Sequence, residues 1–444
     1  MGVYSKEDII RIVREEEIEF VRLQFTDIFG MLKNVAITAS QIEKAVSNQC
    51  MFDGSSIEGF VRIDESDQYL YPDLKSFRVF PWRPSHGRVA RLICDVHDPD
   101  GKPFVGDPRH VLKRALKRAE EMGFDAFNVG PEAEFFLFQT DDEGKPTTRT
   151  NDEAGYFDLG PLDHGEGTRR EICMALEQMD FEIEASHHEC AQGQHEIDFK
   201  YAEALHAADN IMTFKLAVKT LAQRNGLHAT FMPKPIFGIA GSGMHTNMSL
   251  FRNGKNAFYD PDDPRGLSKE AYSFIAGLLH HVRGMAAVTN PLVNSYKRLV
   301  PGYEAPCYLA WSASNRSALI RIPAARGQST RVELRSPDPA CNPYLELALC
   351  LAAGLDGIEK GLTPPPEVTE NIFDMNAAAR KAHGIDSLPD SLEEAIHALE
   401  ADPLVLDTLG EHVAANYIEG KRKEWEEYRT RVSSWEREKY IINY

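Results

Sequence analysis

The chain of 444 residues is long enough for about three domains, and its composition, 43% hydrophobic and 26% charged, is typical of a folded globular protein. Asp and Glu number 68 against 49 Lys and Arg, and the resulting net charge of −19 argues against non-specific binding to nucleic acid or anionic membranes, because the field repels both. The seven cysteines form no CxxC pair, which argues against a disulfide framework or a thiolate metal site and favours a reducing cytoplasm. The N-terminus has no apolar signal core, and no apolar run is long enough to span a bilayer.

The first hundred residues predict a small α+β domain. Ser5 and Asp8 form a cap pair that begins a helix over residues 5–16. Alternating apolar and polar residues then predict strands, and a turn at Gly30 joins the first two of them as a hairpin. The strands are expected at residues 20–27, 35–37, 77–82 and 89–96. A turn at residues 98–103 closes this domain, which we place at residues 1–103.

Residues 104–444 predict one large α+β domain in which charged strands alternate with long helices. Asp107 as N-cap and Pro108 at the first helical position begin its first helix, which runs to about Met122. Further helices are expected at residues 168–179, 205–225, 268–282, 343–360 and 411–431. The chain ends in WEREKYIINY, an aromatic tail that either docks on another subunit or frays.

The stretch GPEAEFFLF sets Glu132 and Glu134 two residues apart at the start of an apolar strand. Side chains alternate faces along a strand, so both carboxylates point the same way. A buried ionised carboxylate is expensive unless a cation lies against it. One such strand alone is also compatible with a solvated sheet face.

Four more stretches carry charge in the same manner. Glu189 and Glu196 flank a turn at Gly193, so that they can face each other across a hairpin. The others are GIAGSGMHTNMSLF with His245, RLVPGYEAPCY with Arg298 and Glu304, and TRVELRSPDP with Arg331, Glu333 and Arg335 on one face of a strand. Taken singly, the Gly-Ser-Gly run is compatible with a plain turn, and His187, His188 and His245 with structural histidines.

Six carboxylate or imidazole groups cannot converge without cations, because like charges that share a site force one another to protonate. These groups are Glu132, Glu134, Glu189, Glu196, His245 and Glu333. Oxygen-rich ligand sets select Mg²⁺ or Mn²⁺, and a pair of such ions indicates phosphate chemistry. Arg298, Arg316, Arg321 and Arg335 offer bidentate forks for carboxylate or phosphate. The chain has no Walker loop, so a nucleotide is not expected on a P-loop helix.

Six stretches, in this order, resemble glutamine synthetase of the bacterial type I class, in the non-adenylylated subclass of Gram-positive bacteria. They are MFDGSSIEGF (51–60), GPEAEFFLF (130–138), HHECAQGQHEID (187–198), GSGMH (241–245), NSYKRLVPGYEAP (294–306) and RVELRSPDPACNPY (331–344). The resemblance covers the whole chain. It implies a β-grasp domain at residues 1–103 and, at 104–444, a catalytic domain of curved antiparallel strands with surrounding helices and a C-terminal oligomerisation tail. It also implies a homo-dodecamer of two stacked hexameric rings, with each active site between neighbouring subunits.

The activity that the resemblance implies is ATP-dependent ligation of ammonia to L-glutamate through a γ-glutamyl phosphate, in nitrogen assimilation, with two or three Mg²⁺ or Mn²⁺ ions. One ion would be held by Glu134, Glu189 and Glu196, and a second by Glu132, His245 and Glu333. Glutamate would contact Gly241, His245, Arg298, Glu304, Arg316 and Arg335, and ATP would contact Glu184, Ser249, Arg316 and Arg321. The implied catalytic residues are Asp53 and Asp67 of the adjacent subunit, which deprotonate ammonium, Arg335, which offsets the charge of phosphoryl transfer, and Glu304, on a flap that excludes water. Asp53 is also compatible with a plain Asx turn.

Two positions depart from relatives. Ala240 stands where the family usually has Asn, so one side-chain contact to the amino acid is missing. Phe373 stands where enterobacterial relatives have a tyrosine that is adenylylated, so feedback or partner proteins are the expected means of control.

Three other functions stay open. A sibling enzyme would join glutamate to a polyamine or another amine, and intact DGSS and Asp67 favour ammonia. A non-catalytic scaffold would be expected to lose metal ligands, and all six are present. Binding of nitrogen-responsive transcription regulators, without direct nucleic-acid contact, is compatible with catalysis.

Overall fold

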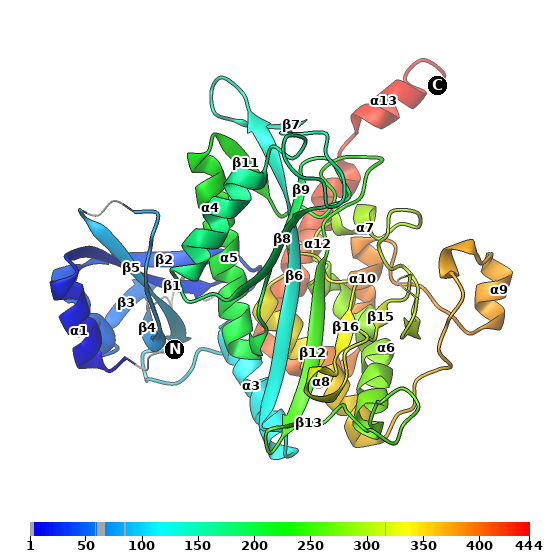
Figure 1. Cartoon of the computed structure of the whole chain (residues 1–444), viewed down its shortest axis with the longest axis horizontal. Coiled ribbons are helices and arrows are strands. Elements are labelled where there is room, and N and C mark those ends of the chain that lie inside the picture. The colour runs from blue at the N-terminus through cyan, green and yellow to red at the C-terminus, as the bar shows by residue number, and fades with distance from the viewer. Residues whose placement is uncertain (1–3, 58, 60–66, 84–85, 316) are drawn as a thin grey trace.

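The structure, a computed structural model, describes residues 4–57, 59, 67–83, 86–315 and 317–444. It has an α+β fold with two separate sheets (Figure 1), which confirms the predicted fold class. The five-stranded sheet lies at one end of the molecule with the N-terminal helix, and the eleven-stranded sheet lies at its centre.

The N-terminal sheet has the strand order β2-β1-β5-β4-β3, in which β1 and β5 are parallel and the other neighbours antiparallel. Its elements are α1 (Lys6–Glu15), β1 (Ile18–Thr26), β2 (Leu32–Thr38), the 3₁₀ helix η1 (Ala39–Gln41), α2 (Ile42–Val46), β3 (Cys50–Asp53), β4 (Asp67–Val79) and β5 (Arg88–His97). The predicted capping box of Ser5 and Asp8 is present at α1. Helices α1 and α2 pack on the sheet face that carries Val21, Leu23 and Phe25, as their alternation predicts.

One predicted strand of this domain is wrong in its bounds. The strand expected at residues 77–82 ends at Val79, because the backbone turns between Phe80 and Arg83, and it begins ten residues earlier, at Asp67. Its partner β3 was not predicted, because only four residues form it and no apolar alternation marks them. Phe80 and Trp82 leave the sheet and stack on each other, 4.7 Å between ring centroids, in the core of the larger domain.

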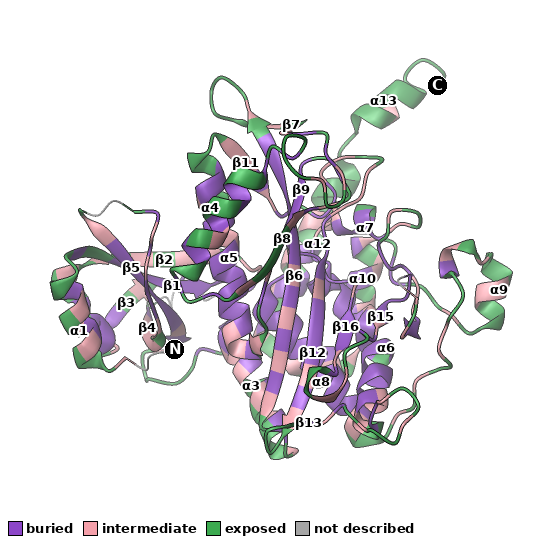
Figure 2. Ribbon diagram, in the orientation of Figure 1, coloured by how far each residue is buried: buried purple, intermediate pink, exposed green. Residues whose placement is uncertain are grey.

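The central sheet follows the path β14-β15-β16-β12-β6-β9-β8, with β7, β10 and β11 paired to β6 and β13 paired to β12. Its strands are β6 (Ala126–Thr140), β7 (Pro146–Thr150), β8 (Ile183–His188), β9 (Gln194–Phe199), β10 (Ala202–Glu203), β11 (Leu227–Thr230), β12 (Met244–Arg252), β13 (Lys255–Asn256), β14 (Trp311–Ser312), β15 (Ile320–Arg321) and β16 (Val332–Leu334). Burial alternates along β6 and β12 (Figure 2), so one face of the sheet is packed and the other remains partly open.

The other described elements of the larger domain are helices. They are α3 (Pro108–Glu121), α4 (Glu166–Glu177), α5 (Ala204–Arg224), α6 (Lys269–Thr289), α7 (Ser295–Arg298), α8 (Pro343–Lys360), α9 (Ala377–Ala382), α10 (Leu392–Glu400), α11 (Pro403–Leu409), α12 (Glu411–Thr430) and α13 (Ser434–Tyr440), with the 3₁₀ helices η3 (Gly327–Ser329) and η4 (Ile372–Asp374). Helix α5 packs on β6 and β11, and α8 lies between α5, α3 and α6. The helices predicted from the sequence are all present, although α6 continues seven residues beyond the expected end, to Thr289.

A buried arginine joins the two domains. Arg109, only 3% exposed, donates to Asp73 of β4 (2.7 Å), to Asp95 of β5 (2.6 Å) and to Asp209 of α5 (3.0 and 3.1 Å). Tyr344 of α8 donates to the same Asp209 carboxylate at 2.7 Å. A buried charge is tolerated only when it is paired in this way, so the N-terminal sheet has one fixed orientation on the helices.

The C-terminal helix α13 projects from the body of the molecule (Figure 1). Trp435, Tyr440, Ile441, Ile442 and Tyr444 are between 48% and 101% exposed. Docking of this tail on another subunit therefore stays a prediction. None of the helices in the described part of the chain is long and apolar enough to cross a membrane.

His281 of α6 gives the helical layer a pH-dependent contribution to stability. It donates from Nδ1 to Asp402, the N-cap of α11, at 2.8 Å, and from Nε2 to Asp356 of α8 at 3.1 Å. Burial alone would lower the pKa of His281, but the hydrogen bonds to these carboxylates raise it above its usual value of 6.5. Such a group stabilises the fold fully below pH 6.5 and loses its contribution as the pH rises through the folded-state pKa.

We therefore expect His281→Gln to lower the free energy of unfolding by about 1.5–3 kcal/mol at pH 6, the range for hydrogen bonds to charged groups. Urea unfolding of both proteins across the pH range measures this difference, which should shrink above neutrality. The exposed His383 supplies the control, His383→Gln, for which no such trend is expected. A difference that grows with pH would contradict the assignment.

Candidate active site

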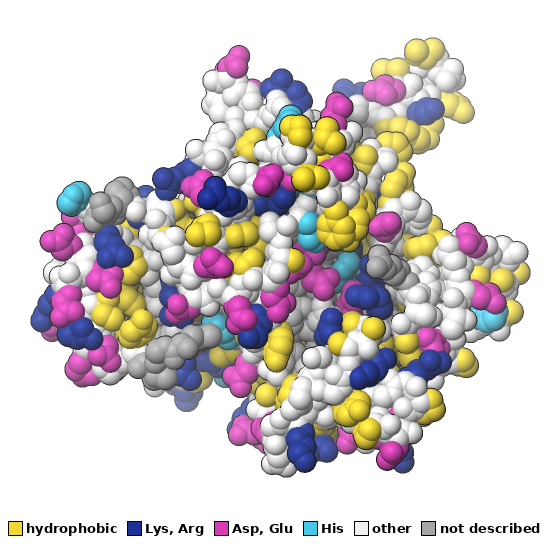
Figure 3. Space-filling view, viewed as in Figure 1, with side chains coloured by type: hydrophobic (Ala, Val, Ile, Leu, Met, Phe, Trp, Pro, Cys, Tyr) yellow, Lys and Arg dark blue, Asp and Glu magenta, His cyan; other side chains and the backbone are white. Residues whose placement is uncertain are grey.

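Strand β6 carries the two glutamates of the GPEAEFFLF stretch to the open face of the central sheet. Glu132 lies opposite His245 of β12, and Glu134 lies opposite Glu196 of β9. Both glutamates point the same way, as predicted, because their intervening neighbour Ala133 is fully buried on the helix side. A single central strand therefore supplies one carboxylate to each of two neighbouring groups. Figure 3 shows acidic, basic and histidine side chains gathered at the centre of this face.

The first group contains Glu132, His245 and Glu333, whose ligand atoms all lie within 4.8 Å of one another. His245 Nδ1 is 3.4 Å from Glu132 Oε2 and 3.7 Å from Glu333 Oε1. Burial raises the pKa of Glu132, but the hydrogen bond and charge of His245 outweigh it and hold that pKa below its usual value. Glu333, 1% exposed, also meets Arg321 at 2.5 Å and Arg335 at 3.3 Å.

The second predicted set is Glu134, Glu189 and Glu196, whose carboxylates are near enough to raise one another's pKa. Among the described residues, however, the metal-competent group around Glu196 contains His187 and Asp198 instead of Glu134 and Glu189. Glu189 and Glu196 do not lie directly opposite each other, because Glu196 pairs with His187, two residues before Glu189, but strand alternation keeps them on one face. His187 reaches both carboxylates at 3.5 Å. Burial and the Glu189 carboxylate raise the pKa of Glu134 to about 8, and burial with the Glu134 and Asp198 carboxylates also raises that of Glu196 strongly. Burial and mutual repulsion outweigh the nearby Arg298 and Arg335 in raising the pKa of Glu134, which fits a site for a divalent cation.

Three further residues belong to this site and were not assigned to it from the sequence. His187 and Asp198 form a third metal-competent group with Glu196. Asn247 of β12 donates to Glu132 at 2.9 Å and accepts from Arg331 at 3.0 Å. Each of the three lies two residues from a predicted ligand on the same strand or its extension, so strand alternation was the signal that would have found them.

A buried network fixes the β8–β9 hairpin from behind. Asp152 accepts from His188 Nε2 and from the backbone N–H of Gly193, both at 3.0 Å. His188 Nδ1 donates to the carbonyl of Glu189 at 2.7 Å, and Arg169 donates to His195 Nδ1 at 2.8 Å. Asp152, His188 and His195 are close enough to hold a metal, but both nitrogens of His188 and Nδ1 of His195 are already engaged in these bonds. The network therefore holds the hairpin that presents Glu189 and Glu196.

A cleft of about 440 Å³ opens beside the first group. Glu184 of β8 and Ser249 of β12 line it, as do Tyr201 and Arg331. The structure thus brings Glu184 and Ser249 together as the resemblance implies, while Arg321 lies on Glu333 at the edge of the site. Arg316, the other arginine expected at the nucleotide, lies outside the described residues.

Gly241 lies where no larger residue fits. A Cβ there would stand 2.3 Å from the Pro233 carbonyl oxygen and 3.3 Å from the side chains of Lys234 and Arg298. The Gly241 carbonyl accepts from Gln194 at 3.1 Å, and Gln194 also donates to Glu134 at 2.8 Å. The Gly-Ser-Gly run is therefore tied directly to the second carboxylate group.

The stretch RLVPGYEAPCY, unlike the other charged stretches, contains no strand. It begins in the short helix α7 and continues as an irregular turn, because Pro301 and Pro306 remove two strand hydrogen-bond donors. Arg298, 3% exposed, donates to the carbonyls of Arg335, Ser336 and Pro337. Its guanidinium therefore anchors the segment that carries Arg335, in addition to lying beside Gly243.

Glu304 has a left-handed backbone, with φ of +62°, and its exposed side chain meets Cys190 Sγ at 3.8 Å. Cys190 follows Glu189 directly, and its backbone N–H donates to the Glu189 carboxylate at 2.9 Å. The loop of Glu304 therefore lies at the edge of the second carboxylate group.

Asp53 and Asp67 are paired directly across β3 and β4 of the N-terminal sheet, and no interaction in the described residues links them to the glutamates of the central sheet. The Asx turn considered for Asp53 is present, since its Oδ1 accepts from the Ser55 N–H at 2.8 Å and the Ser55 hydroxyl at 2.6 Å. These hydrogen bonds hold the pKa of Asp53 below its usual value. One chain alone does not bring these aspartates to the site.

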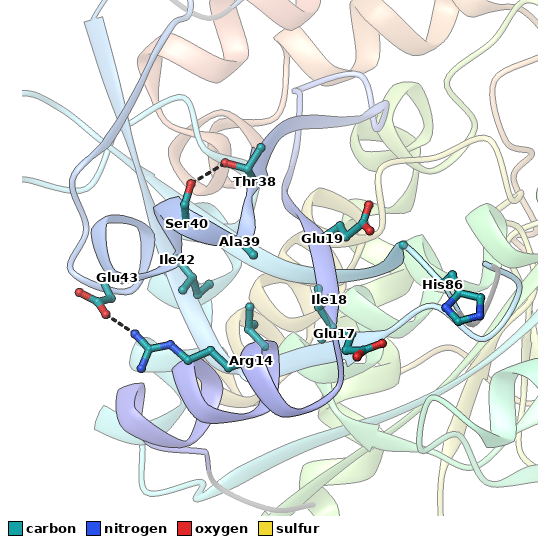
Figure 4. Close-up of a pocket in the computed structure, with 12 residues that line it drawn as sticks. Arg14, Glu17, Ile18, Glu19, Thr38, Ala39, Ser40, Ile42, Glu43 and His86 are labelled. Carbon is teal, nitrogen blue, oxygen red and sulfur yellow. Dashed lines mark hydrogen bonds and ion pairs between the residues drawn. The ribbon is translucent and has the colours of Figure 1, made fainter.

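A larger cavity of about 670 Å³ lies in the N-terminal domain, between α1, β1 and η1 (Figure 4). An Arg14–Glu43 ion pair and a Thr38–Ser40 hydrogen bond close its rim. It contains none of the residues predicted for the site. Volume alone therefore does not identify the functional centre of this chain.

Comparison with known proteins gives matches along the whole chain. A family model described as "Glutamine synthetase, beta-Grasp domain" matches residues 17–99, and one described as "Glutamine synthetase, catalytic domain" matches residues 105–440. The chain is 66% identical over 444 residues to glutamine synthetase of Clostridium saccharobutylicum, covering 100% of both chains. It is 58% identical over 441 residues to glutamine synthetase of Staphylococcus aureus strain Mu50, covering 99% of both.

Solved structures give the same result. A chain described as a GmaS/ADP complex superposes with a TM-score of 0.89 at 36% identity, covering 98% of this chain and 99% of that one. A cryo-EM structure of Plasmodium falciparum glutamine synthetase superposes with a TM-score of 0.87 at 26% identity, covering 99% of both chains.

Mn²⁺ binding is expected to release protons at pH 7, because Glu134, with a pKa of about 8, and Glu196 must ionise to become ligands. Titration calorimetry in buffers of different ionisation enthalpy measures this, and we expect a release of about two protons and an affinity that rises with pH. Glu196→Gln should lower the number of protons released. A binding enthalpy that is the same in every buffer would contradict this account.

Proposed function

The chain belongs to the glutamine synthetase family, type I of Gram-positive bacteria, and joins ammonia to L-glutamate at the expense of ATP; from this premise we propose how its residues carry out the reaction. The single observation that carries the proposal is the metal-competent group of Glu132, His245 and Glu333, which lies beside a cleft of about 440 Å³ and next to the paired Glu134 and Glu196. The proposed course is transfer of the ATP γ-phosphoryl group to the γ-carboxylate of glutamate, followed by displacement of phosphate by ammonia. We propose that the domains meet at residue 103, between the β-grasp and catalytic domains.

Two divalent cations, Mg²⁺ or Mn²⁺, fit the two groups, with a third accommodated when ATP binds. Glu134, Glu189 and Glu196 would hold one, and Glu132, His245 and Glu333 the other. When bound, the cations neutralise phosphoryl oxygens and polarise the transferred group. The mutual repulsion of buried carboxylates supports this assignment, since it is relieved by cations and by little else in the site.

The nucleotide is proposed to lie in the cleft between β6, β8 and β12. Glu184 and Ser249 line it, and Arg321, with Arg316, would contact the phosphates. A relative of 36% identity is described as an ADP complex, which supports nucleotide binding at a shared fold. The adenine end would lie toward Tyr201 and the phosphates toward Glu132, because Glu132 belongs to the cation group.

Glutamate is proposed to lie between the Gly241 backbone and the arginines, with His245 and Glu304 at its sides. Arg335, held over Glu333, would offset the charge that develops on the transferred phosphoryl group. Arg298 and Arg316 would bind carboxylate oxygens of the substrate. Ala240 packs with Ile236 and Ile239 against Phe136 and Phe138 and offers no side-chain hydrogen bond to the amino acid.

Ammonium must lose a proton before its nitrogen can attack the acyl carbon. We propose that Asp53 and Asp67 accept it from across a subunit boundary, which agrees with their position on the N-terminal sheet, apart from the glutamates of the same chain. Glu304, on the loop beside Cys190, would close the site so that water does not hydrolyse the acyl phosphate.

This arrangement requires an oligomer. We propose a homo-dodecamer of two hexameric rings in the cytoplasm, and the exposed apolar tail that follows α12 supports contact with another subunit. Phe373, in η4, packs near Tyr308 and has no hydroxyl to modify, which favours control by feedback or by nitrogen-responsive regulators.

The purified protein should release phosphate from ATP only when glutamate, ammonium and Mg²⁺ or Mn²⁺ are all present, with glutamine formed in equal amount. A parallel assay with a diamine instead of ammonium tests the amine-ligase alternative. Turnover with the diamine but not with ammonium would mean that the diamine, and not ammonia, is the amine substrate. Absence of turnover in both assays would favour a non-catalytic scaffold.

Asp53→Ala should remove most ammonium-dependent turnover, about 10²–10⁴-fold for a lost general base, while nucleotide binding stays close to that of the wild type. Steady-state kinetics and ADP titration measure the two quantities. Ser55→Ala is the matched control, because it removes the Asx-turn hydroxyl but keeps the carboxylate. An equal loss of turnover in both variants would mean that Asp53 acts only by forming the Asx turn and not as a base.

A further inference from the structure

Lys234 is a buried cation beside the proposed active site that neither the metal groups nor the nucleotide cleft uses. It is 7% exposed and lies in the segment between β11 and β12. No carboxylate among the described residues forms an ion pair with it. Instead, its Nζ donates to the Ile239 carbonyl and lies 3.9 Å from the ring centroid of Tyr303.

The backbone of Lys234 is held on both sides. Its N–H donates to Asn294 Oδ1 at 2.8 Å, and Asn294 Nδ2 donates back to its carbonyl at 3.0 Å. The preceding carbonyl, of Pro233, accepts from Ser242 at 2.8 Å. The lysine therefore projects from a fixed base that is shared with the Gly-Ser-Gly run and with the start of α7.

The loop that receives the cation is held in part by Ala305, which is buried in the core, and by the contact between Glu304 and Cys190 Sγ. Gly302 and Glu304, on either side of Tyr303, both have left-handed backbones, with φ of +96° and +62°. A non-glycine residue in this region costs about 1–3 kcal/mol and persists only when surrounding contacts impose it. The cation over the Tyr303 ring is such a contact, since it joins the loop to the fixed segment.

We propose that Lys234 is a positioning residue that holds Tyr303, and through it Glu304, in place over the acyl phosphate. The inference rests on the proposed function, because it assigns to Glu304 the exclusion of water. Burial and the nearby Arg298 lower the pKa of Lys234. Because no described carboxylate pairs with this ammonium group, the electron-rich face of Tyr303 also helps to stabilise its charge. Without the cation, the loop would leave its closed position more often and water would compete with ammonia.

The test is the ratio of phosphate to glutamine in Lys234→Met, with Lys234→Arg as the variant that keeps a cation. We expect the uncoupled fraction of phosphate release to rise by about 2- to 30-fold in Lys234→Met, the range of one cation–π contact, and to return toward the wild-type value in Lys234→Arg. Tyr303→Leu should behave as Lys234→Met does, and Tyr303→Phe as the wild type. The double variant Lys234→Met/Tyr303→Leu should be no worse than either single variant.

The control is Lys219→Met on α5, whose Nζ lies 5.8 Å from the Phe231 ring, away from the loop. It should leave the ratio unchanged. Hydrogen exchange of residues 299–306, measured without substrates, should accelerate in Lys234→Met and in Tyr303→Leu but not in Lys219→Met. This second measurement separates loop release from a general loss of folding.

The outcomes separate a failure of the positioning role of Lys234 from a failure of the proposed function. Tight coupling in Lys234→Met, with unchanged exchange, would overturn the positioning role and leave the proposed function intact. A wild-type protein that forms no glutamine from ammonium would overturn the function, while accelerated exchange in Lys234→Met would still support the contact to Tyr303.

Discussion

The repulsion between carboxylates that share one sheet face is the constraint on which the rest of this structure depends. Strand β6 lies between β12 and β9, and its period of two puts Glu132 and Glu134 on one face. The register of the sheet then sets Glu132 beside His245 of β12 and Glu134 beside Glu196 of β9. Burial and like charge raise the pKa of Glu134 to about 8, so the ionised form of this carboxylate is unfavourable in the folded protein. A site built in this way binds divalent cations because it is otherwise unfavourable.

The surrounding elements hold the carboxylates in spite of that repulsion. On one side, Asp152 and His188 fix the β8–β9 hairpin through the Gly193 turn. On the other, Gln194 and the Gly243 N–H donate to Glu134 at 2.8 and 3.0 Å. Each of these donors lies on a strand or at a strand end, so a rigid sheet and its buried hydrogen bonds offset the repulsion between the carboxylates.

The part of the site that follows local periodicity could be predicted from the sequence. Glu132 and Glu134 were placed on one face because covalent geometry fixes the alternation of side chains. His187, Asp198 and Asn247 obey the same rule but were missed, because histidine, aspartate and asparagine are common in structural roles and only their neighbours across the sheet reveal their use. Those neighbours depend on the order of the strands in the sheet, which no single segment of the sequence determines.

The remaining features depend on contacts between distant segments, and for these the sequence carries a misleading local signal. RLVPGYEAPCY carries charged residues as the neighbouring strands do, yet its two prolines and a left-handed Glu304 make it a loop. What gives that loop its position is a lysine seventy residues earlier, whose own surroundings are set by α7 and the Gly-Ser-Gly run. The molecule therefore separates two tasks. A stiff sheet holds the acidic groups, and in the proposed function a strained loop, stabilised by a few contacts, opens and closes over them.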